Sequence, residues 1–164
     1  MKKGTPNFAR DSEEGQSLVE LAIVAVLLIL IMVAVVDLGR AYFIFLALQD
    51  AAGEGAAYGT IHPSWCKEDD NPNPNNIAFR VRHESPSGMI SWDDTTVLVA
   101  APFPTPGNTI SVTVIYDYPL ITPFMGALAG GGTLPVRAQA VQTILASDGD
   151  GFFTGEVCID EPTS

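Results

Sequence analysis

The stretch that decides the fold, Gly15 to Ile61, reads GQSLVELAIVAVLLILIMVAVVDLGRAYFIFLALQDAAGEGAAYGTI. It contains no proline, and the next proline is Pro63. Residues Leu21 to Val36 are apolar without a break, and helix-forming residues such as Ala, Leu, Gln and Glu are frequent beyond them. These features predict a long N-terminal helix over residues 16–61. From Gln16 to Tyr58 it would measure roughly 65 Å, at ~1.5 Å per residue.

Only the first half of this helix is apolar enough to enter lipid. The hydrocarbon core of a bilayer needs about 20 helical residues, and residues 17–36 supply that length. Basic residues orient a membrane helix: three of them precede the apolar run, and the next one after it is Arg40. We therefore expect a single-pass protein of the cytoplasmic membrane, with a cytoplasmic N-terminus and an extracytoplasmic region over residues 62–164. An ordinary secretory signal is the alternative, but no A-x-A-like cleavage site follows the run.

A single carboxylate, Glu20, stands at the start of the apolar run. A charge near hydrocarbon costs a few kcal/mol and normally has a partner. One interpretation places Glu20 at the headgroup boundary, where the cost is small. The other rests on its neighbourhood, because Glu20 is the fifth residue after Gly15 and the apolar run begins directly behind it. In this arrangement the N-terminus resembles type IV prepilins and pseudopilins, the substrates of the prepilin peptidase.

Three sequence motifs sharpen this resemblance. A G-Q-x-L-V-E start covers Gly15 to Glu20, a D-x-G-R turn covers Asp37 to Arg40, and ALQDAAGEGAAY covers Ala47 to Tyr58. Together they resemble the signature of the TadE-like family, the pseudopilins of tight-adherence (Flp) pilus systems. A weaker similarity covers Val112 to Phe124. Where the family usually has an Arg before the Tyr, this chain has Ala57.

The resemblance implies a minor pseudopilin that takes part in pilus assembly or priming. Residues 1–15 would be a cytoplasmic leader, which the prepilin peptidase removes by cutting between Gly15 and Gln16. The new α-amino group of Gln16 would be positive at neutral pH and could pair with Glu20 of its own chain or of a neighbour. The implied partners are other pilus or pseudopilus subunits and the inner-membrane assembly platform, and the subunit could enter an extracellular pilus.

Two alternatives stay open. The chain could be a static single-span anchor that displays an extracytoplasmic binding domain, which would need neither cleavage nor a role for Glu20. It could also be a major filament subunit. The resemblance favours a minor subunit, because the major Flp pilins are little more than the helix.

The outer half of the helix has faces of different character. One carries charged residues, namely Asp37, Arg40, Asp50 and Glu54. Another is the expected floor for a packed sheet and consists of Phe45, Gln49, Ala52 and Ala56. A stripe of small residues recurs at every fourth position, at Ala47, Ala51, Gly55 and Gly59. Such a stripe permits close helix packing and could be a helix–helix seam in an assembly, or an accident of an Ala-rich helix. Gly59 and Pro63 are expected to end the helix.

The rest of the chain predicts a small domain of mixed structure. Residues 76–84 fit a helix or a strand, and we favour the helix. A segment rich in β-branched residues predicts a strand over 95–101, and alternating apolar and polar residues predict strands over 109–116 and 134–145. A short membrane-proximal helix is expected over 123–129. The predicted fold class is α+β, a long N-terminal helix packed on a small antiparallel β-sheet, as in pilins.

The two cysteines, Cys66 and Cys158, both fall on the side expected outside the membrane. Oxidising compartments favour pairing, so a disulfide between them is predicted. His62 and His83 are expected to be ordinary surface residues, since they and two distant cysteines make a poor zinc site. The acidic segments 69–73 and 148–151 lack the complete pattern of a calcium loop. We therefore predict no metal and no cofactor.

Charge and motifs exclude several functions. The net charge is −11, and no basic patch is available to neutralise phosphates, so nucleic acid is not an expected partner. The sequence contains no nucleophile elbow, P-loop, zinc-protease or dinucleotide motif. The acidic pair Asp93 and Asp94 beside Trp92 fits a solvated turn better than an acid–base pair. We predict that the protein is not an enzyme.

Overall fold

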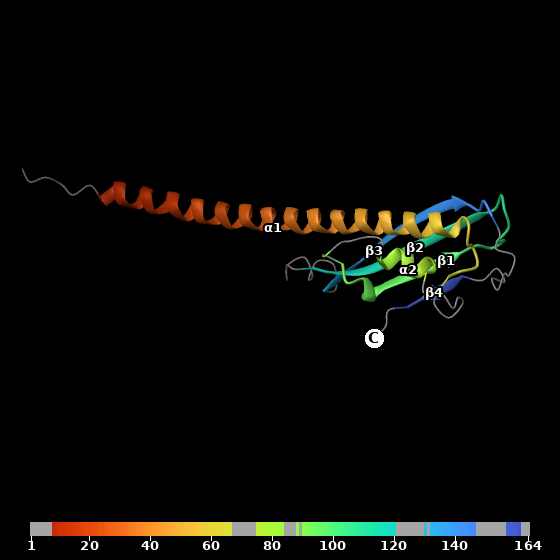
Figure 1. The fold of residues 1–164 in the computed structure, drawn as a ribbon. Helices are drawn as coiled ribbons and strands as arrows, with labels where there is room; N and C mark the ends of the chain where they lie inside the picture. The colour runs from red at the N-terminus through yellow and green to blue at the C-terminus, as the bar shows by residue number, and fades with distance from the viewer. Residues whose placement is uncertain are drawn as a thin grey trace, which may run out of the picture.

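The computed structural model describes residues 8–66, 75–83, 88, 90–120, 130, 132–146 and 157–161. Its dominant element is α1, a single helix over Phe8–Gly59. The first half of α1 projects alone as a rod, and its second half lies along a β-sheet (Figure 1). The predicted long helix is therefore confirmed, and so is its end at Gly59. It begins at Phe8 rather than at Gln16, however, and runs without a break through Gly15.

The sheet has four antiparallel strands in the order β3-β2-β1-β4. In chain order they are β1 (Thr95–Ala100), β2 (Thr109–Pro119), β3 (Thr133–Thr143) and β4 (Cys158–Asp160). β2 and β3 pair along their whole length, from Thr109 opposite Thr143 to Pro119 opposite Thr133. The predicted α+β fold with an antiparallel sheet is confirmed.

The hydrophobic core lies between one face of the sheet and the second half of α1. Strand residues alternate as expected for a sheet with one buried face, and the buried set includes Val97 and Val99 of β1 and Val112 and Val114 of β2. α1 contributes mostly small side chains. Its fully buried residues are Ile44, Leu48, Ala51, Ala52 and Ala56.

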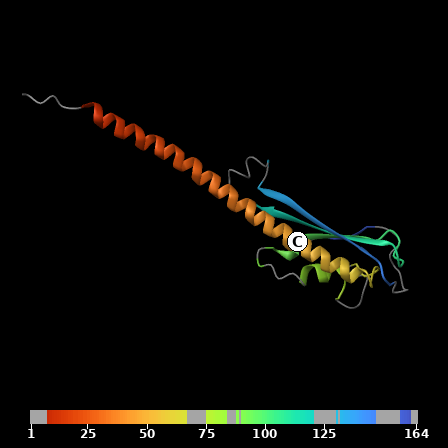
Figure 2. The same ribbon diagram turned by 90° about the horizontal axis from the view of Figure 1, so that it is seen from above.

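A second helix, α2 (Ile77–His83), completes the core beside α1. Seen from above, α1 runs between the sheet and α2 (Figure 2), and α2 also contacts β1. The backbone N–H of Phe79 donates a 2.8 Å hydrogen bond to Oδ1 of Asn76, which caps the start of α2. Ile77 and Val81 then face the core. The preference for a helix over a strand in this segment is confirmed.

Some elements differ from the predictions or were missed. A short 3-10 helix, η2 (Trp92–Asp94), leads into β1, and Asp93 and Asp94 are exposed there. β2 continues to Pro119, past its expected end at residue 116, because the alternation of buried residues extends through Tyr118. β4 was not predicted, since three residues are too few to show a period. The helix expected over 123–129 and the acidic segments 69–73 and 148–151 lie outside the described residues.

Candidate membrane and assembly helix

The first half of α1 exposes its apolar side chains to the surroundings. Leu28 and Ile29, for example, are 59% and 61% exposed, although a protein core normally takes up such residues. Within the described residues, α1 from Gly15 onward is the one helix that is long and apolar enough to cross a membrane. An all-round apolar helix with no protein neighbour needs lipid or other apolar helices around it.

The start of this segment carries the residues of the predicted processing site. Gly15, Gln16 and Glu20 are all exposed. The side-chain amide of Gln16 donates a 3.3 Å hydrogen bond to a carboxylate oxygen of Glu20, one turn along the helix. A Cβ added to Gly15 would meet no atom within 4 Å. A larger residue could therefore replace Gly15 without disturbing the packing of the described residues.

The apolar half of α1 ends at a charged cluster that faces the sheet. Asp37 is only 4% exposed and Arg40 is half-buried. The guanidinium carbon of Arg40 lies 5.8 Å from the centre of the Tyr118 ring, in cation–π geometry. Asp37 therefore differs from Asp50 and Glu54, which the helical wheel places on the same side of α1 but which are exposed. The reason is that β2 is longer than expected and brings Tyr118 alongside this turn of α1.

Tyr118 is the residue that sequence reasoning missed at this junction. Its side chain is 1% exposed, and its hydroxyl has no hydrogen-bond partner in the part of the chain that the structure describes. Burial raises the pKa of Tyr118, the Asp37 carboxylate and Tyr116 raise that pKa further, and the Arg40 guanidinium opposes them. The alternation from Ile110 to Tyr116 was the signal that could have found Tyr118, because it continues for one more step.

The small-residue stripe lies inside the subunit. Ala51, Gly55 and Gly59 are buried, and Ala47 is half-buried. A Cβ on Gly55 would come within 2.5 Å of a methyl group of Val81, and a Cβ on Gly59 within 2.6 Å of Ile110. The stripe thus lets α1 approach α2 and the sheet closely. It is not available as a seam between subunits, which corrects that interpretation.

The expected sheet-facing group on α1 is only partly confirmed. Ala52 and Ala56 are buried, and the Gln49 side chain donates a 3.1 Å hydrogen bond to the backbone carbonyl of Gln139 in β3. Phe45, in contrast, is 37% exposed. It lies on the edge of the buried face, where the sheet does not cover it.

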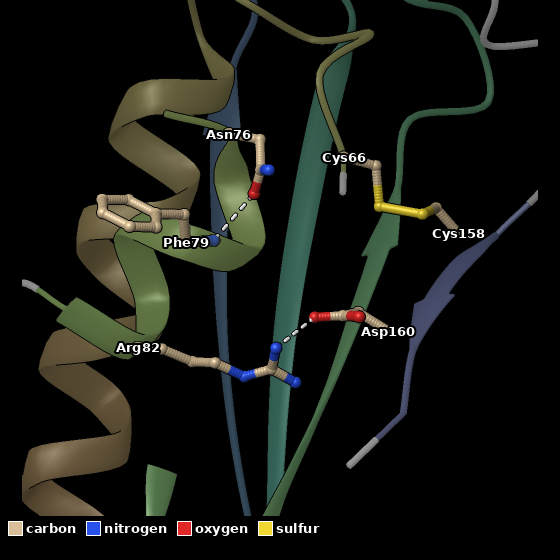
Figure 3. Close-up of a disulfide and its surroundings, with 6 residues drawn as sticks. All are labelled: Cys66, Asn76, Phe79, Arg82, Cys158 and Asp160. Carbon is tan, nitrogen blue, oxygen red and sulfur yellow. Dashed lines mark hydrogen bonds and ion pairs between the residues drawn. A yellow bond between two sulfur atoms is a disulfide. The ribbon is translucent and has the colours of Figure 1, made fainter. Parts of the chain in front are cut away.

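Cys66 and Cys158 form the predicted disulfide, with their Cα atoms 6.4 Å apart. Figure 3 shows this disulfide and a second link to β4, an ion pair in which Nη1 of Arg82 and Oδ2 of Asp160 are 2.6 Å apart. Arg82 also donates a 3.2 Å hydrogen bond to the carbonyl of Thr95. The short strand β4 is therefore held to α2 and to the loop after α1 by one covalent bond and one ion pair.

The two histidines, His62 and His83, lie in different surroundings. His83 is exposed and stacks on Phe79, whereas His62 is half-buried and stacks on Trp65, with ring centroids 4.0 Å apart. The expectation of an ordinary surface position thus fits His83 better than His62. Within the described ranges, no three His, Cys, Asp or Glu residues are grouped so that they could hold a metal ion.

The fold defines a class of protein: an α+β domain carried on a long helix whose free half could span a membrane. A comparison with protein families then gives a match to TadE-like protein over residues 15–57, about a quarter of the chain. The match confirms the resemblance drawn from the three motifs, and it suggests a protein associated with the Tad pilus. No curated protein and no solved structure matches the chain.

Proposed function

We propose that this chain is a minor pseudopilin of a tight-adherence pilus system, processed by a prepilin peptidase and used in pilus assembly or priming. The observation that carries the proposal is the exposed apolar half of α1, which begins at the Gly15–Glu20 motif and lies within the matched segment. Such a surface is suited to lipid before assembly and to neighbouring apolar helices afterwards. The proposed partners are the peptidase, other pilus subunits and the inner-membrane assembly platform.

The folded domain supports a minor subunit over a major one. It has its own core and its own disulfide between Cys66 and Cys158. A major Flp-type subunit would consist of little more than α1. We place the domain outside the cytoplasm, where a disulfide can persist, with residues 1–15 in the cytoplasm.

Processing can be tested at Gly15. Gly15→Leu should abolish cleavage and leave a longer form, whereas wild-type protein from cells with the peptidase should begin at Gln16. Because a Cβ at Gly15 meets nothing within 4 Å, loss of cleavage would not reflect a packing defect. Gly53→Leu is the matched control, since Gly53 lies on the same helix and has equally open surroundings. Mass spectrometry of the mature N-terminus shows whether cleavage has occurred. A wild-type chain that starts at Met1 in cells with the peptidase would refute processing.

The role of Glu20 in assembly distinguishes a pseudopilin from a static anchor. After processing, Glu20 could accept the positive α-amino group of Gln16 from a neighbouring chain, and a low local dielectric would strengthen that attraction well beyond that of an exposed pair. Against this, Glu20 already accepts a hydrogen bond from the Gln16 side chain, so a static anchor would also leave it satisfied.

The test is co-purification of partner subunits and pilus counts for Glu20→Leu. We expect normal insertion and cleavage but failed association with other subunits. Glu54→Leu removes an exposed carboxylate from the second half of the same helix and should assemble normally. Unchanged assembly of Glu20→Leu would favour the static anchor.

A further inference from the structure

The exposed apolar surface of α1 does not stop where a membrane span would. Beyond residue 36, Phe45 lies at the edge of the buried face, and the apolar surface continues through four other large side chains, Leu38, Tyr42, Phe43 and Leu46, which are 73%, 59%, 60% and 39% exposed. At ~100° per residue these four lie within roughly 140° of one another around the helix. They occupy the side of α1 opposite the buried Ile44 and Leu48.

This surface carries no exposed carboxylate or ammonium group. Between Leu21 and Gln49 the charged residues are Asp37 and Arg40. The buried Asp37 and the half-buried Arg40 both lie on the side of α1 that faces Tyr118 and the sheet. The cluster therefore leaves the opposite side of the helix free of charge for a further two to three turns.

We propose that Leu38, Tyr42, Phe43 and Leu46 form a collar that sits in the headgroup region of the bilayer, on the side of the membrane that carries the domain. The inference rests on the proposed function only in taking α1 as a membrane span. Its partner is the lipid surface itself, before the subunit enters any assembly.

The length of the surface fits this placement. Residues 21–46 cover about 39 Å at ~1.5 Å per residue, whereas the hydrocarbon core is about 30 Å thick. With Glu20 at one headgroup boundary, the hydrocarbon would end near Arg40, about 30 Å away. Leu38 would then lie just inside the boundary, and Leu46 would lie about 9 Å outside it. The headgroup region on one side is about 5–8 Å deep, so the collar spans it.

The types of residue along this side of α1 also fit the placement, because they change at the point where the headgroup region should end. Tyr is enriched at membrane interfaces, because its ring is apolar and its hydroxyl is polar. The Tyr42 ring meets Phe43 edge-on, with centroids 6.5 Å apart. Beyond Leu46 the same side of α1 turns small and acidic. Its residues there are Asp50, Gly53, Glu54 and Ala57.

The collar should prefer neutral or zwitterionic lipid. It contains no basic residue, and the chain carries a net charge of −11, so an anionic surface would repel the domain. A consequence is that the collar fixes the depth of the subunit. It would hold the end of the sheet at Pro119 and Thr133, which lies next to the Tyr118 cluster, close to the membrane surface.

The experiment uses single cysteines labelled with an environment-sensitive NBD probe, in the full chain reconstituted in phosphatidylcholine vesicles. Cys66 and Cys158 are bonded to each other, so the introduced thiol is the reactive one. Phe43→Cys reports the collar and Leu30→Cys reports the span. Ala57→Cys is the matched control, because it is exposed on nearly the same side of α1 as Leu46 but lies about 16 Å further from the membrane.

Nitroxide-labelled lipids then report depth. We expect a headgroup nitroxide to quench the Phe43 probe, a mid-chain nitroxide to quench the Leu30 probe, and neither to quench the Ala57 probe. Quenching at Leu30 without quenching at Phe43 would overturn the collar and leave the span intact. No quenching at Leu30 would overturn the span and the collar together. A blue shift at Phe43 that disappears when protein is diluted in lipid would assign this surface to a second copy, and the lipid collar would be wrong.

Discussion

The two halves of α1 share one continuous helix and differ in what surrounds them. In the first half the apolar side chains are large and exposed, as at Leu28 and Ile29. In the second half the buried positions are mostly Ala and Gly, with Leu48 and Ile44 as the large exceptions. The difference teaches that side-chain size, and not apolar content alone, separates the two environments. Lipid accepts large side chains all round, whereas close contact with a sheet and a second helix needs small ones.

The largest expected effect concerns the covalent bond that belongs to the domain half alone. The double variant Cys66→Ser, Cys158→Ser opens a loop with a sequence separation of 92 residues. In the chain-entropy model such a loop contributes roughly 4–5 kcal/mol to stability. The variant should lower the urea midpoint of the domain strongly. The first half of α1 lies outside the loop and should stay helical in detergent.

Tryptophan fluorescence can follow this transition, because Trp65 and Trp92 are the only tryptophans and both lie in the domain. Circular dichroism reports the helix in the same samples. An unchanged midpoint would mean that the disulfide does not constrain the unfolded domain, and a parallel loss of helix signal would remove the distinction between the two halves.

The next effect comes from the same substitution made once in each half. Leu48 is fully buried, so Leu48→Ala should cost the domain about 2–5 kcal/mol through lost contacts and a cavity. Leu28 is 59% exposed, and Leu28→Ala should leave the unfolding of the domain unchanged. The measurement is urea unfolding in detergent by tryptophan fluorescence. Equal losses from both variants would show that the first half also packs against the domain.

A smaller effect distinguishes two glycines that are two positions apart. Gly55→Ala places a Cβ within 2.5 Å of a Val81 methyl group in a filled core. Overpacking of this kind costs about 1–3 kcal/mol. A gain of roughly 0.5–1 kcal/mol in helix propensity offsets part of it. Gly53→Ala meets open space and should therefore be stabilising by that gain alone. Opposite signs in the change of the urea midpoint are the expected result, and a stabilising Gly55→Ala would contradict the packing role of the stripe.

Much of the fold could be predicted because its signals are local. The apolar run and the absence of proline specify α1, β-branched residues specify β1, and period-two alternation specifies β2 and β3. The disulfide followed from two cysteines placed on one side of the membrane. The family match over residues 15–57 rests on the same N-terminal motifs that the sequence displays.

What could not be predicted depends on tertiary contacts between distant segments. A helical wheel places Asp37 among charged residues, but it cannot show that Tyr118 of β2 covers that turn of α1. A helical wheel also cannot show whether the small-residue stripe, which includes Gly55, packs against a neighbouring subunit or against the chain's own α2. β4 owes its place to Cys158 and to the ion pair of Asp160 with Arg82, neither of which has a sequence period.

The smallest expected effect lies at the junction of the two halves, where Tyr118 meets Asp37 and Arg40. Burial raises the pKa of Tyr118 above its ordinary value near 10, and Asp37 and Tyr116 act in the same direction against Arg40. Above about pH 10 the unfolded chain therefore loses this proton before the folded chain does. The unfolded state then binds fewer protons, so stability falls as pH rises from about 10, and below that pH the group contributes no pH dependence.

Tyr118→Phe should consequently make the alkaline loss of stability shallower as the pH rises above about 10. At pH 7 it should change stability little, because the ring stays beneath Arg40 and the lost hydroxyl has no hydrogen-bond partner in the described part of the chain. Urea midpoints across this pH range measure the slope, and Tyr42→Phe, which removes an exposed hydroxyl from α1, is the control. An unchanged alkaline slope in Tyr118→Phe would mean that water reaches this hydroxyl in the folded protein. The junction would then be open to solvent. The sheet would not shield Asp37 and Arg40 from water, and the contrast between the charged, sheet-facing side of α1 and its apolar side would be weaker than the structure indicates.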